Sequence, residues 1–256
     1  MTLIGKRIVI TRAEHQADEL TCLIEQAGGI PILYPCIEIM PPDNTVALDS
    51  ALRHLSVYDT VIFTSSNTVF SVAERLANLD IVFDWRTIRI IAVGDKTDAL
   101  IQSTFNGEAD FIPSHYTAST LADELPIQHG EKILLPLSAL SDGELTDLLT
   151  ARGAEVTTVE AYQTVIGTGG EDVPALLREN KIDAITFTSG STVTNFVKRI
   201  APETAYDIPA VCIGPSTHAV AMDAGFTNVV YPENYTLIDM LHLLSGLFNE
   251  VQYGNT

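Results

Sequence analysis

The chain has 256 residues, of which 46% are apolar, so it is long enough and apolar enough for one large or two small hydrophobic cores. Its 33 acidic and 14 basic side chains leave a net charge of −19, which argues against phosphate-backbone binding and so against a nucleic-acid partner. Cys22, Cys36 and Cys212 show no CxxC spacing, which indicates neither a disulfide framework nor a metal cluster, and we expect buried reduced thiols. Lys6 and Arg7 interrupt the apolar start, and no apolar run reaches the ~18 residues of a membrane span, which favours a cytoplasmic protein that does not contact membranes.

The first forty residues predict a strand, a helix and a second strand. Residues 7–12 form a short apolar run that ends in polar groups, as expected of a buried parallel strand. Residues 17–27 carry apolar side chains at helical spacing, and a pair of glycines ends the helix. Residues 30–34 predict the second strand, whereas the prolines around residues 36–40 favour an extended connector that leaves the first domain.

The rest of the chain continues as alternating strands and helices. Up to residue 125 we expect a helix at 48–55, a strand before residue 64 with a helix through residue 79, a strand at 88–93 with a helix from residue 94, a segment at 109–113 leading to exposed residues 116–119, and a helix at 121–125. A strand at 132–136, a helix around 145–149, a strand at 156–162 and a glycine-rich connector at 165–170 follow. The last elements expected are a helix at 173–180, a strand at 184–187 with a helix behind it, strands at 211–213 and 229–232, and a helix at 235–247. This alternation is typical of α/β folds with a parallel sheet.

One stretch occurs twice, and the chain is organised around it. Residues 61–69 read Val-Ile-Phe-Thr-Ser-Ser-Asn-Thr-Val, and residues 184–193 read Ala-Ile-Thr-Phe-Thr-Ser-Gly-Ser-Thr-Val. In each copy an apolar run precedes hydroxyl side chains, which suit a helix N-cap because their oxygens accept from unpaired backbone N–H groups. Further matches at a similar separation, such as Tyr116 with Tyr235, predict two homologous α/β units.

Pairing of the first strand–helix–strand unit with the last three motifs makes the domains discontinuous. One domain then holds residues 1–36 and 166–256, the other holds residues 40–162, and residues 37–39 and 163–165 form the linker. Open α/β sheets bind ligands at the carboxyl ends of their strands. We therefore expect two similar parallel-sheet domains of flavodoxin- or Rossmann-like type, with their pockets facing each other across a cleft.

Six motifs, in order along the chain, resemble those of the uroporphyrinogen-III synthase family. They are Ile10-Thr11-Arg12, Phe63-Thr64-Ser65, Val93-Gly94-Asp95-Lys96-Thr97, Ala161-Tyr162-Gln163-Thr164, Phe187-Thr188-Ser189-Gly190-Ser191 and Ile213-Gly214-Pro215-Ser216-Thr217. The resemblance covers nearly the whole chain and implies two α/β domains joined by a two-stranded linker. It also implies an enzyme that cyclises linear hydroxymethylbilane to uroporphyrinogen III, with inversion of the last pyrrole ring and loss of water, and that uses neither metal nor cofactor.

The resemblance also assigns roles to particular residues. Tyr162 matches the family's tyrosine that protonates the leaving hydroxyl, and a phenol with an ordinary pKa of about 10 carries its proton at neutral pH. The substrate has eight carboxylates, which backbone N–H groups at helix N-termini can bind. We expect substrate contacts from Thr11, Arg12, Thr64, Ser65, Ser66, Gly94, Lys96, Thr97, Ser138, Ser189, Gly190, Ser191, Gly214, Ser216, Thr217 and Tyr235.

Several alternatives remain open at this point. Leu137 stands where many family members carry a basic residue, and strong acidity is unfavourable for an anionic substrate, so a non-catalytic tetrapyrrole- or anion-binding relative is the alternative function. An unrelated sugar- or amino-acid-binding protein would normally carry an export signal. Tyr162 could be structural, and Arg12 could pair with a local acid. As an enzyme of this family, the protein is expected to be a monomer in transient contact with the upstream hydroxymethylbilane synthase.

Overall fold

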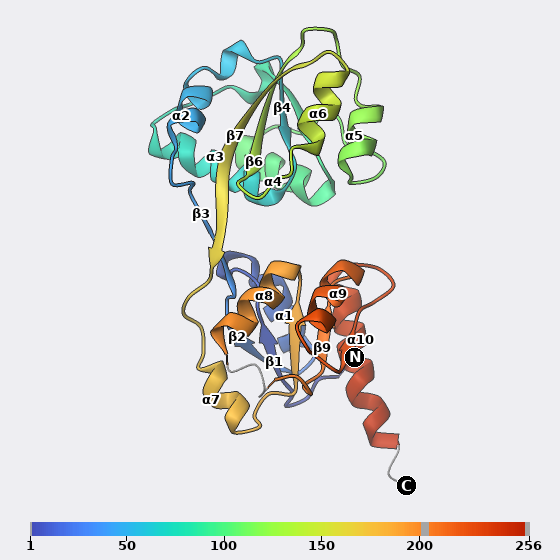
Figure 1. The fold of residues 1–256 in the computed structure, drawn as a ribbon. Helices are drawn as coiled ribbons and strands as arrows, with labels where there is room; N and C mark the ends of the chain where they lie inside the picture. The colour runs from blue at the N-terminus through green and yellow to red at the C-terminus, as the bar shows by residue number, and fades with distance from the viewer. Residues whose placement is uncertain (1, 201–204, 254–256) are drawn as a thin grey trace. The chain divides into compact units, whose positions relative to one another are not determined.

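The computed structural model describes residues 2–200 and 205–253, which fold into two compact units (Figure 1). Unit 1 combines the residues up to Glu38 with those from Val165 onward, and unit 2 holds Ile39–Thr164. The chain therefore begins unit 1, forms the whole of unit 2, and then returns to complete unit 1.

Unit 1 is built on a five-stranded sheet with the strand order β10-β9-β8-β1-β2. Its strands are β1 (Arg7–Ile10), β2 (Ile30–Leu33), β8 (Ala184–Phe187), β9 (Ala210–Cys212) and β10 (Val229–Val230). All neighbouring strands run parallel, and in the central pair Ile8 lies opposite Ala184. The central strands are almost fully buried, as expected of a parallel sheet that helices cover on both faces.

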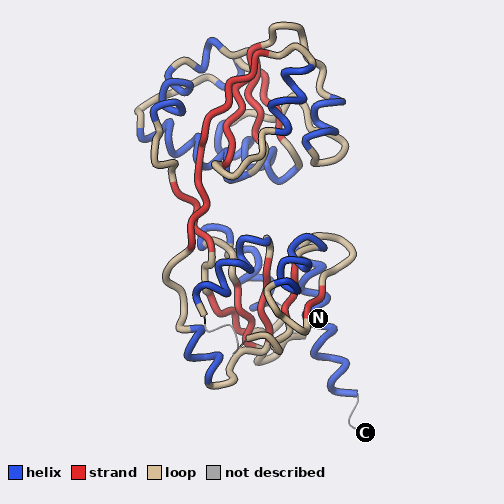
Figure 2. The backbone as a smooth tube through the Cα atoms, in the orientation of Figure 1, coloured by secondary structure: helices blue, strands red, loops and turns tan. Residues whose placement is uncertain are grey.

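Helices lie on both faces of this sheet (Figure 2). They are α1 (Asp18–Gln26), α7 (Val173–Arg178), α8 (Gly190–Arg199), α9 (Pro215–Asp223) and α10 (Leu237–Tyr253), with the 3-10 turn η1 (Glu14–Gln16) before α1. Phe187, Phe196 and Phe226 form the centre of the core beneath α7, α8 and α9, whereas Leu20 and Met240 belong to the core beneath α1 and α10. The amphipathic helix α8 buries Val193 and Phe196 in this way, whereas the buried side chains of α9 are the small residues Thr217 and Ala221.

Unit 2 has a second five-stranded sheet, with the order β3-β7-β6-β4-β5. Its strands are β3 (Ile37–Met40), β4 (Thr60–Phe63), β5 (Arg89–Ala92), β6 (Lys132–Ser138) and β7 (Glu155–Ile166). One face carries α2 (Val46–Arg53), α3 (Ser66–Asn78), α4 (Asp95–Phe105) and the 3-10 turns η2 (Leu55–Val57) and η3 (Trp85–Thr87), and the other carries α5 (Ala118–Glu124) and α6 (Glu144–Ala151). Trp85 and Phe105 stack with ring centroids 4.1 Å apart in the first of these cores.

The two sheets have the same topology when they are aligned on the repeated stretch. β8 and β4 precede its two copies, β1 and β6 lie on one side of them, and β9 and β5 lie on the other. β2 and β7 follow outside β1 and β6, which is the order found in flavodoxin-like sheets. The expected fold class, two similar parallel α/β units, is confirmed.

The chain crosses between the units in two segments that pair with each other. The N–H of Gly167 donates to the carbonyl of Cys36 at 3.1 Å, and the side-chain amide of Gln163 donates to the carbonyl of Pro41 at 3.0 Å. Residue numbers rise along one segment as they fall along the other, so β3 and the end of β7 run in opposite directions. β7 is longer than the strand expected at 156–162 because it continues into this pair.

Arg199, at the end of α8, ties both crossing segments to unit 1. Its guanidinium donates to the carbonyl of Pro35 and, at 2.8 Å, to the carbonyl of Gly169. Its Cζ also lies 3.9 Å from the centroid of the Tyr34 ring, and a cation in that position is attracted by the ring face. The connectors are thus held at their unit 1 ends.

One expectation about the cysteines is wrong. Cys22 is exposed on α1, where its position in the helix directs it away from the sheet. Cys36 and Cys212 are buried as expected, and burial raises the pKa of each thiol to about 12. These two thiols therefore stay protonated and unreactive at neutral pH.

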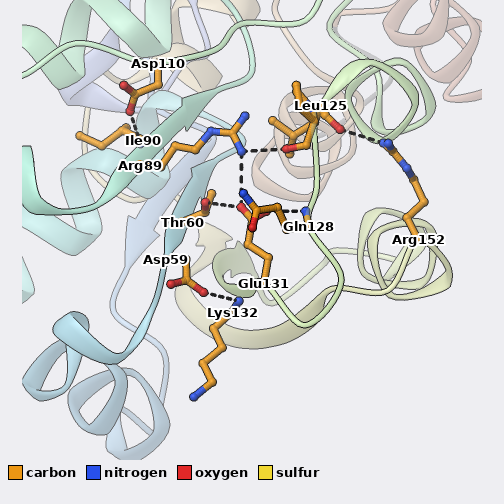
Figure 3. A network of polar contacts seen from close by, with 11 residues as sticks. Asp59, Thr60, Arg89, Ile90, Asp110, Leu125, Gln128, Glu131, Lys132 and Arg152 are labelled. Carbon is orange, nitrogen blue, oxygen red and sulfur yellow. Dashed lines mark hydrogen bonds and ion pairs between the residues drawn. The ribbon is translucent and has the colours of Figure 1, made fainter.

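A buried carboxylate holds together the amino ends of three strands of unit 2 (Figure 3). Glu131 accepts from the hydroxyl of Thr60 at 2.6 Å and from the N–H of Gln128 at 2.9 Å. It also lies 3.4 Å from a guanidinium nitrogen of Arg89. Because β4 and β5 begin at Thr60 and Arg89, and β6 begins directly after Glu131, this network fixes the edge of the sheet opposite to the strands' carboxyl ends.

We expect Glu131→Ala to destabilise unit 2 by about 2–4 kcal/mol, because it leaves the buried hydroxyl of Thr60 and the N–H of Gln128 without their acceptor and removes the ion pair of Arg89. Denaturant unfolding followed by the fluorescence of Trp85, the single tryptophan, measures the change. Glu179→Ala is the matched control, since Glu179 pairs with Lys181 at an exposed position, and it should leave the unfolding midpoint unchanged. Equal midpoints for the two variants would contradict the role given to Glu131.

Candidate functional site

The site residues expected from the sequence fall at the carboxyl ends of parallel strands in both units. Those of unit 2 are Thr64, Ser65, Ser66, Gly94, Lys96, Thr97, Ser138 and Tyr162. Those of unit 1 are Thr11, Arg12, Ser189, Gly190, Ser191, Gly214, Ser216, Thr217 and Tyr235. The structure thus gathers each set at the edge of a sheet where α/β proteins bind ligands.

The two copies of the Phe-Thr-Ser turn have the same backbone geometry. Ser65 has φ −160° and ψ 161°, and Ser189 has φ −162° and ψ 160°. Each serine oxygen accepts at 3.3 Å from the backbone N–H three residues further on, so both serines are N-caps, of α3 and α8. A cap satisfies only part of the first turn, and its other N–H groups carry the partial positive charge that attracts anions.

The side chain of Tyr162 reaches the point in unit 2 where the strand order reverses, between β6 and β4. Tyr162 on β7 pairs with Ser138 of β6, and its phenol oxygen lies 3.5 Å from Oγ of Ser65, directly after β4. Oγ of Ser65 lies 3.0 Å from the hydroxyl of Thr68. Tyr162 is only 8% exposed, so surrounding residues hold its hydroxyl at the end of a short row of hydroxyl groups.

In unit 1 the corresponding point lies between β1 and β8, next to Thr11 and Arg12. Thr11 is fully buried, and its hydroxyl donates to the carbonyl of Thr186 at 2.6 Å, so this side chain supports the sheet. Arg12 is half-buried; burial lowers the pKa of its guanidinium, while the charge of Glu19 acts in the opposite direction. Its Nε is buried and has no hydrogen-bond partner among the described residues. A ligand carboxylate would supply the missing acceptor.

The starts of α4 and α9 combine buried and exposed side chains. Thr97 and Thr217 are buried, and the hydroxyl of Thr97 donates to the carbonyl of Val93 at 3.4 Å. Lys96 and Ser216, each next to one of these threonines, are exposed. At these two helix starts, the exposed neighbours are therefore better placed than the threonine hydroxyls to meet a ligand.

Two adjoining pockets lie at the carboxyl edge of unit 2. The smaller has a volume of about 220 Å³ and the larger about 650 Å³. The loop after β6 and the start of α6 line both of them. Thr64 lines the smaller pocket and Ser138 the larger, whereas Tyr162 lines neither.

Tyr116 is a pocket residue that is absent from the set expected from the sequence. A Cβ added at Gly94 would lie 3.3 Å from its ring, and its hydroxyl donates to Asp95 at 2.9 Å, a bond that raises the pKa of Tyr116. Tyr235 lies in the same way over Gly214 in unit 1, again at 3.3 Å. The sequence match between Tyr116 and Tyr235 was the signal that could have identified it, since Tyr235 is an expected substrate contact.

No metal site is evident in the part of the chain that the structure describes. Within residues 2–200 and 205–253, no group of three or more His, Cys, Asp or Glu side chains could hold an ion. His218 packs edge-on against Tyr231 with centroids 5.1 Å apart, and Nδ1 of His115 lies 3.1 Å from the hydroxyl of Ser114, so both histidines contact local neighbours. None of the helices over the same residues is long and apolar enough to cross a bilayer.

Comparison with known proteins identifies relatives over almost the full length of the chain. A family model described as Uroporphyrinogen-III synthase HemD matches residues 18–242. The uroporphyrinogen-III synthase of Synechococcus elongatus is 31% identical over 249 residues, which cover 93% of this chain and 94% of that protein. The crystal structure of uroporphyrinogen-III synthetase from Helicobacter pylori has the same fold, with a TM-score of 0.65 at 16% identity over 95% of this chain and 100% of that chain. The crystal structure of a mutant uroporphyrinogen III synthase from Thermus thermophilus also has this fold, with a TM-score of 0.63 at 17% identity over 96% of this chain and 100% of that chain. The chain therefore belongs to the uroporphyrinogen-III synthase family.

Proposed function

We propose that the protein is a uroporphyrinogen-III synthase, which cyclises linear hydroxymethylbilane to uroporphyrinogen III with inversion of the last pyrrole ring and loss of water. Membership of the family over residues 18–242 supports the reaction. The single observation that supports the site best is the position of the Tyr162 hydroxyl, 3.5 Å from Ser65 at the point where the strand order of unit 2 reverses.

Tyr162 is proposed as the proton donor. Hydroxide is a poor leaving group, so its loss from the hydroxymethyl carbon is faster when an acid protonates it as the bond breaks. A phenol held by a buried ring can provide that proton without a metal ion. The hydroxyl of Ser65, which is partly exposed, can return a proton from solvent to the phenol because it both donates and accepts, and the buried hydroxyl of Thr68 holds it in place.

The substrate carboxylates are proposed to bind at the helix starts of both units. The N-caps of α3 and α8 have equal geometry, and each leaves first-turn N–H groups for an anion. Lys96 and Ser216 add exposed polar side chains at the starts of α4 and α9. Arg12 is a half-buried cation at the carboxyl edge of unit 1, and a carboxylate would supply the partner that its Nε lacks among the described residues.

Three finer properties are part of this proposal. The protein is proposed to be cytoplasmic and monomeric and to receive hydroxymethylbilane in a transient contact with the synthase that produces it. The instability of a linear substrate that closes spontaneously supports such a contact, because a short transfer limits uncatalysed closure.

The purified protein should convert hydroxymethylbilane to the III isomer, whereas the protein-free control gives the I isomer. Chromatographic separation of the two isomers after oxidation measures the ratio, and treatment with a chelator should not change it. If the ratio equals that of the control at protein concentrations near those of the substrate, the enzyme proposal is wrong, and the non-catalytic relative is favoured.

Tyr162→Phe should lower the rate by about 10²–10⁴ because it removes the acid and keeps the buried ring. Thermal unfolding should change little, since the hydroxyl of Ser65 keeps its contact with Thr68. Tyr58→Phe is the matched control, because Tyr58 packs against the same hydrophobic cluster, and it should retain the normal rate. A normal rate in Tyr162→Phe would remove the proposed role.

Arg12→Gln should raise KM about tenfold, since it removes a charge-assisted contact to a substrate carboxylate. Its melting temperature should stay equal or rise, because burial disfavours the guanidinium charge in the free protein. Kinetics and thermal unfolding together therefore separate a binding role from a structural one. Arg178→Gln, at an exposed position on α7, is the control. A lower melting temperature with an unchanged KM would indicate that Arg12 serves the fold alone.

A further inference from the structure

The smaller pocket of unit 2, which we call the Tyr116 pocket, has an apolar lining and no assigned role. Its volume is about 220 Å³, and its apolar lining consists of Val93, Ala118, Leu121, Leu137 and Leu145. Leu121 and Leu145 also belong to the buried core beneath α5 and α6, which fixes their positions. A preformed apolar concavity of this kind is typical of small-molecule sites.

The ring of Tyr116 forms a flat, rigid wall of this pocket. It is 57% exposed, yet it is held from two sides, by contact with Gly94 and by the hydrogen bond from its hydroxyl to Asp95 at 2.9 Å. Gly94 has φ 103°, and an added Cβ would lie 3.3 Å from the ring, so both the backbone and the packing require glycine there. The accessible ring face can therefore receive another flat ring with little loss of side-chain entropy.

The polar groups of the pocket favour a neutral ring over a carboxylate. Asp142 lines the pocket, and none of the described lining residues is a lysine or an arginine. Thr146 also lines it, and the hydroxyl of Thr146 is buried without a hydrogen-bond partner among the described residues. That hydroxyl can accept from an N–H group, whereas the nearby carboxylate disfavours an anion.

We propose that the Tyr116 pocket binds one pyrrole ring of the linear tetrapyrrole, stacked on the Tyr116 ring with its N–H directed to Thr146. This inference rests on the proposed function. The volume is below the roughly 300 Å³ at which pockets for drug-sized ligands begin, so it suits one substituted five-membered ring and not the whole substrate. The acetate and propionate of the bound ring then extend out of the pocket.

The Tyr116 pocket and the proposed proton donor, Tyr162, both contact the turn that follows β4. Thr64 lines the pocket, and the next residue, Ser65, contacts the hydroxyl of Tyr162. Successive side chains of an extended segment point to opposite sides, so the turn separates the two places by a single residue. A ring held against Tyr116 therefore anchors the tetrapyrrole beside Tyr162 and leaves its other rings free to rearrange.

Tyr116→Ala should raise KM for hydroxymethylbilane roughly three- to tenfold and change kcat by less than about twofold, because a stacking face binds ground state and transition state alike. Tyr116→Phe keeps the ring and should keep the KM of the unmodified protein. Val82→Ala, at a valine that is 99% exposed, is the control for an unrelated surface change. An unchanged KM in Tyr116→Ala would overturn the proposal. An equal rise of KM in Tyr116→Phe would also overturn it, because the effect would then come from loss of the hydrogen bond to Asp95 and not from loss of the ring.

A binding measurement separates this inference from the proposed activity. The probe is a monopyrrole that carries one acetate and one propionate, added to the full chain with labelled leucine methyl groups. The methyl signals of Leu121, Leu137 and Leu145 should shift in the unmodified protein and in Tyr116→Phe, and should not shift in Tyr116→Ala. Absence of these shifts at saturating probe overturns the pocket even if the III isomer forms. Shifts without formation of the III isomer support the pocket and overturn the enzyme.

Discussion

The pairing of β1 with β8 is the contact on which the organisation of this chain depends. It joins strands that are separated in sequence by the whole of unit 2, with Ile8 opposite Ala184. Two buried hydroxyl bonds reinforce it, from Thr11 to the carbonyl of Thr186 at 2.6 Å and from Thr186 to the carbonyl of Val9 at 2.7 Å. Because β1 and β8 are the inner strands of their sheet, unit 1 cannot form from either end of the chain alone. Unit 2 is consequently an insertion, and its own compactness lowers the entropy cost of closing so long a loop.

The strand order of unit 1 reverses between β1 and β8, where these two strands pair. Because the units are repeats, the strand order of unit 2 reverses at the corresponding point, between β6 and β4. On either side of that place the chain leaves the sheet in opposite directions, so helix starts and strand ends surround an open space. The N-caps Ser65 and Ser189 lie at these two places with nearly equal dihedral angles. The two edges are both proposed to bind anions, and among the described residues it is the N-cap serine of unit 2 that has a tyrosine hydroxyl beside it. The proposed chemistry is accordingly asymmetric although the scaffold is repeated.

The sequence predicted the features that short segments encode and missed those that several elements build together. An apolar run followed by an N-cap serine is a local signal, and it correctly indicated β4 with α3 and β8 with α8. The hydroxyl of a threonine gives no such signal, because it can face a ligand or satisfy a carbonyl in the sheet, as Thr11 does. The Tyr116 pocket is lined from β6, α5, α6 and the loops beside them, whose approach no spacing in the sequence reveals. The buried Glu131 was missed for the same reason, since its partners Thr60 and Arg89 lie on other strands.

The strong acidity of the chain is compatible with a substrate that carries eight carboxylates, because charge repulsion between exposed groups weakens with their separation in salt solution. At physiological ionic strength, salt screens exposed charges beyond about 8 Å, so a net charge of −19 acts mainly on the rate of encounter. Binding is decided at hydrogen-bond distance, where the N–H groups of helix starts present partial positive charge whatever the outer surface carries. The half-buried guanidinium of Arg12 is shielded from water and so interacts with an anion more strongly than an exposed lysine would. The stacking proposed in the Tyr116 pocket would add affinity that does not depend on the charge of the substrate. An acidic exterior is therefore compatible with the recognition proposed here, which depends on backbone donors, the half-buried guanidinium of Arg12 and ring stacking at the carboxyl edges of the sheets.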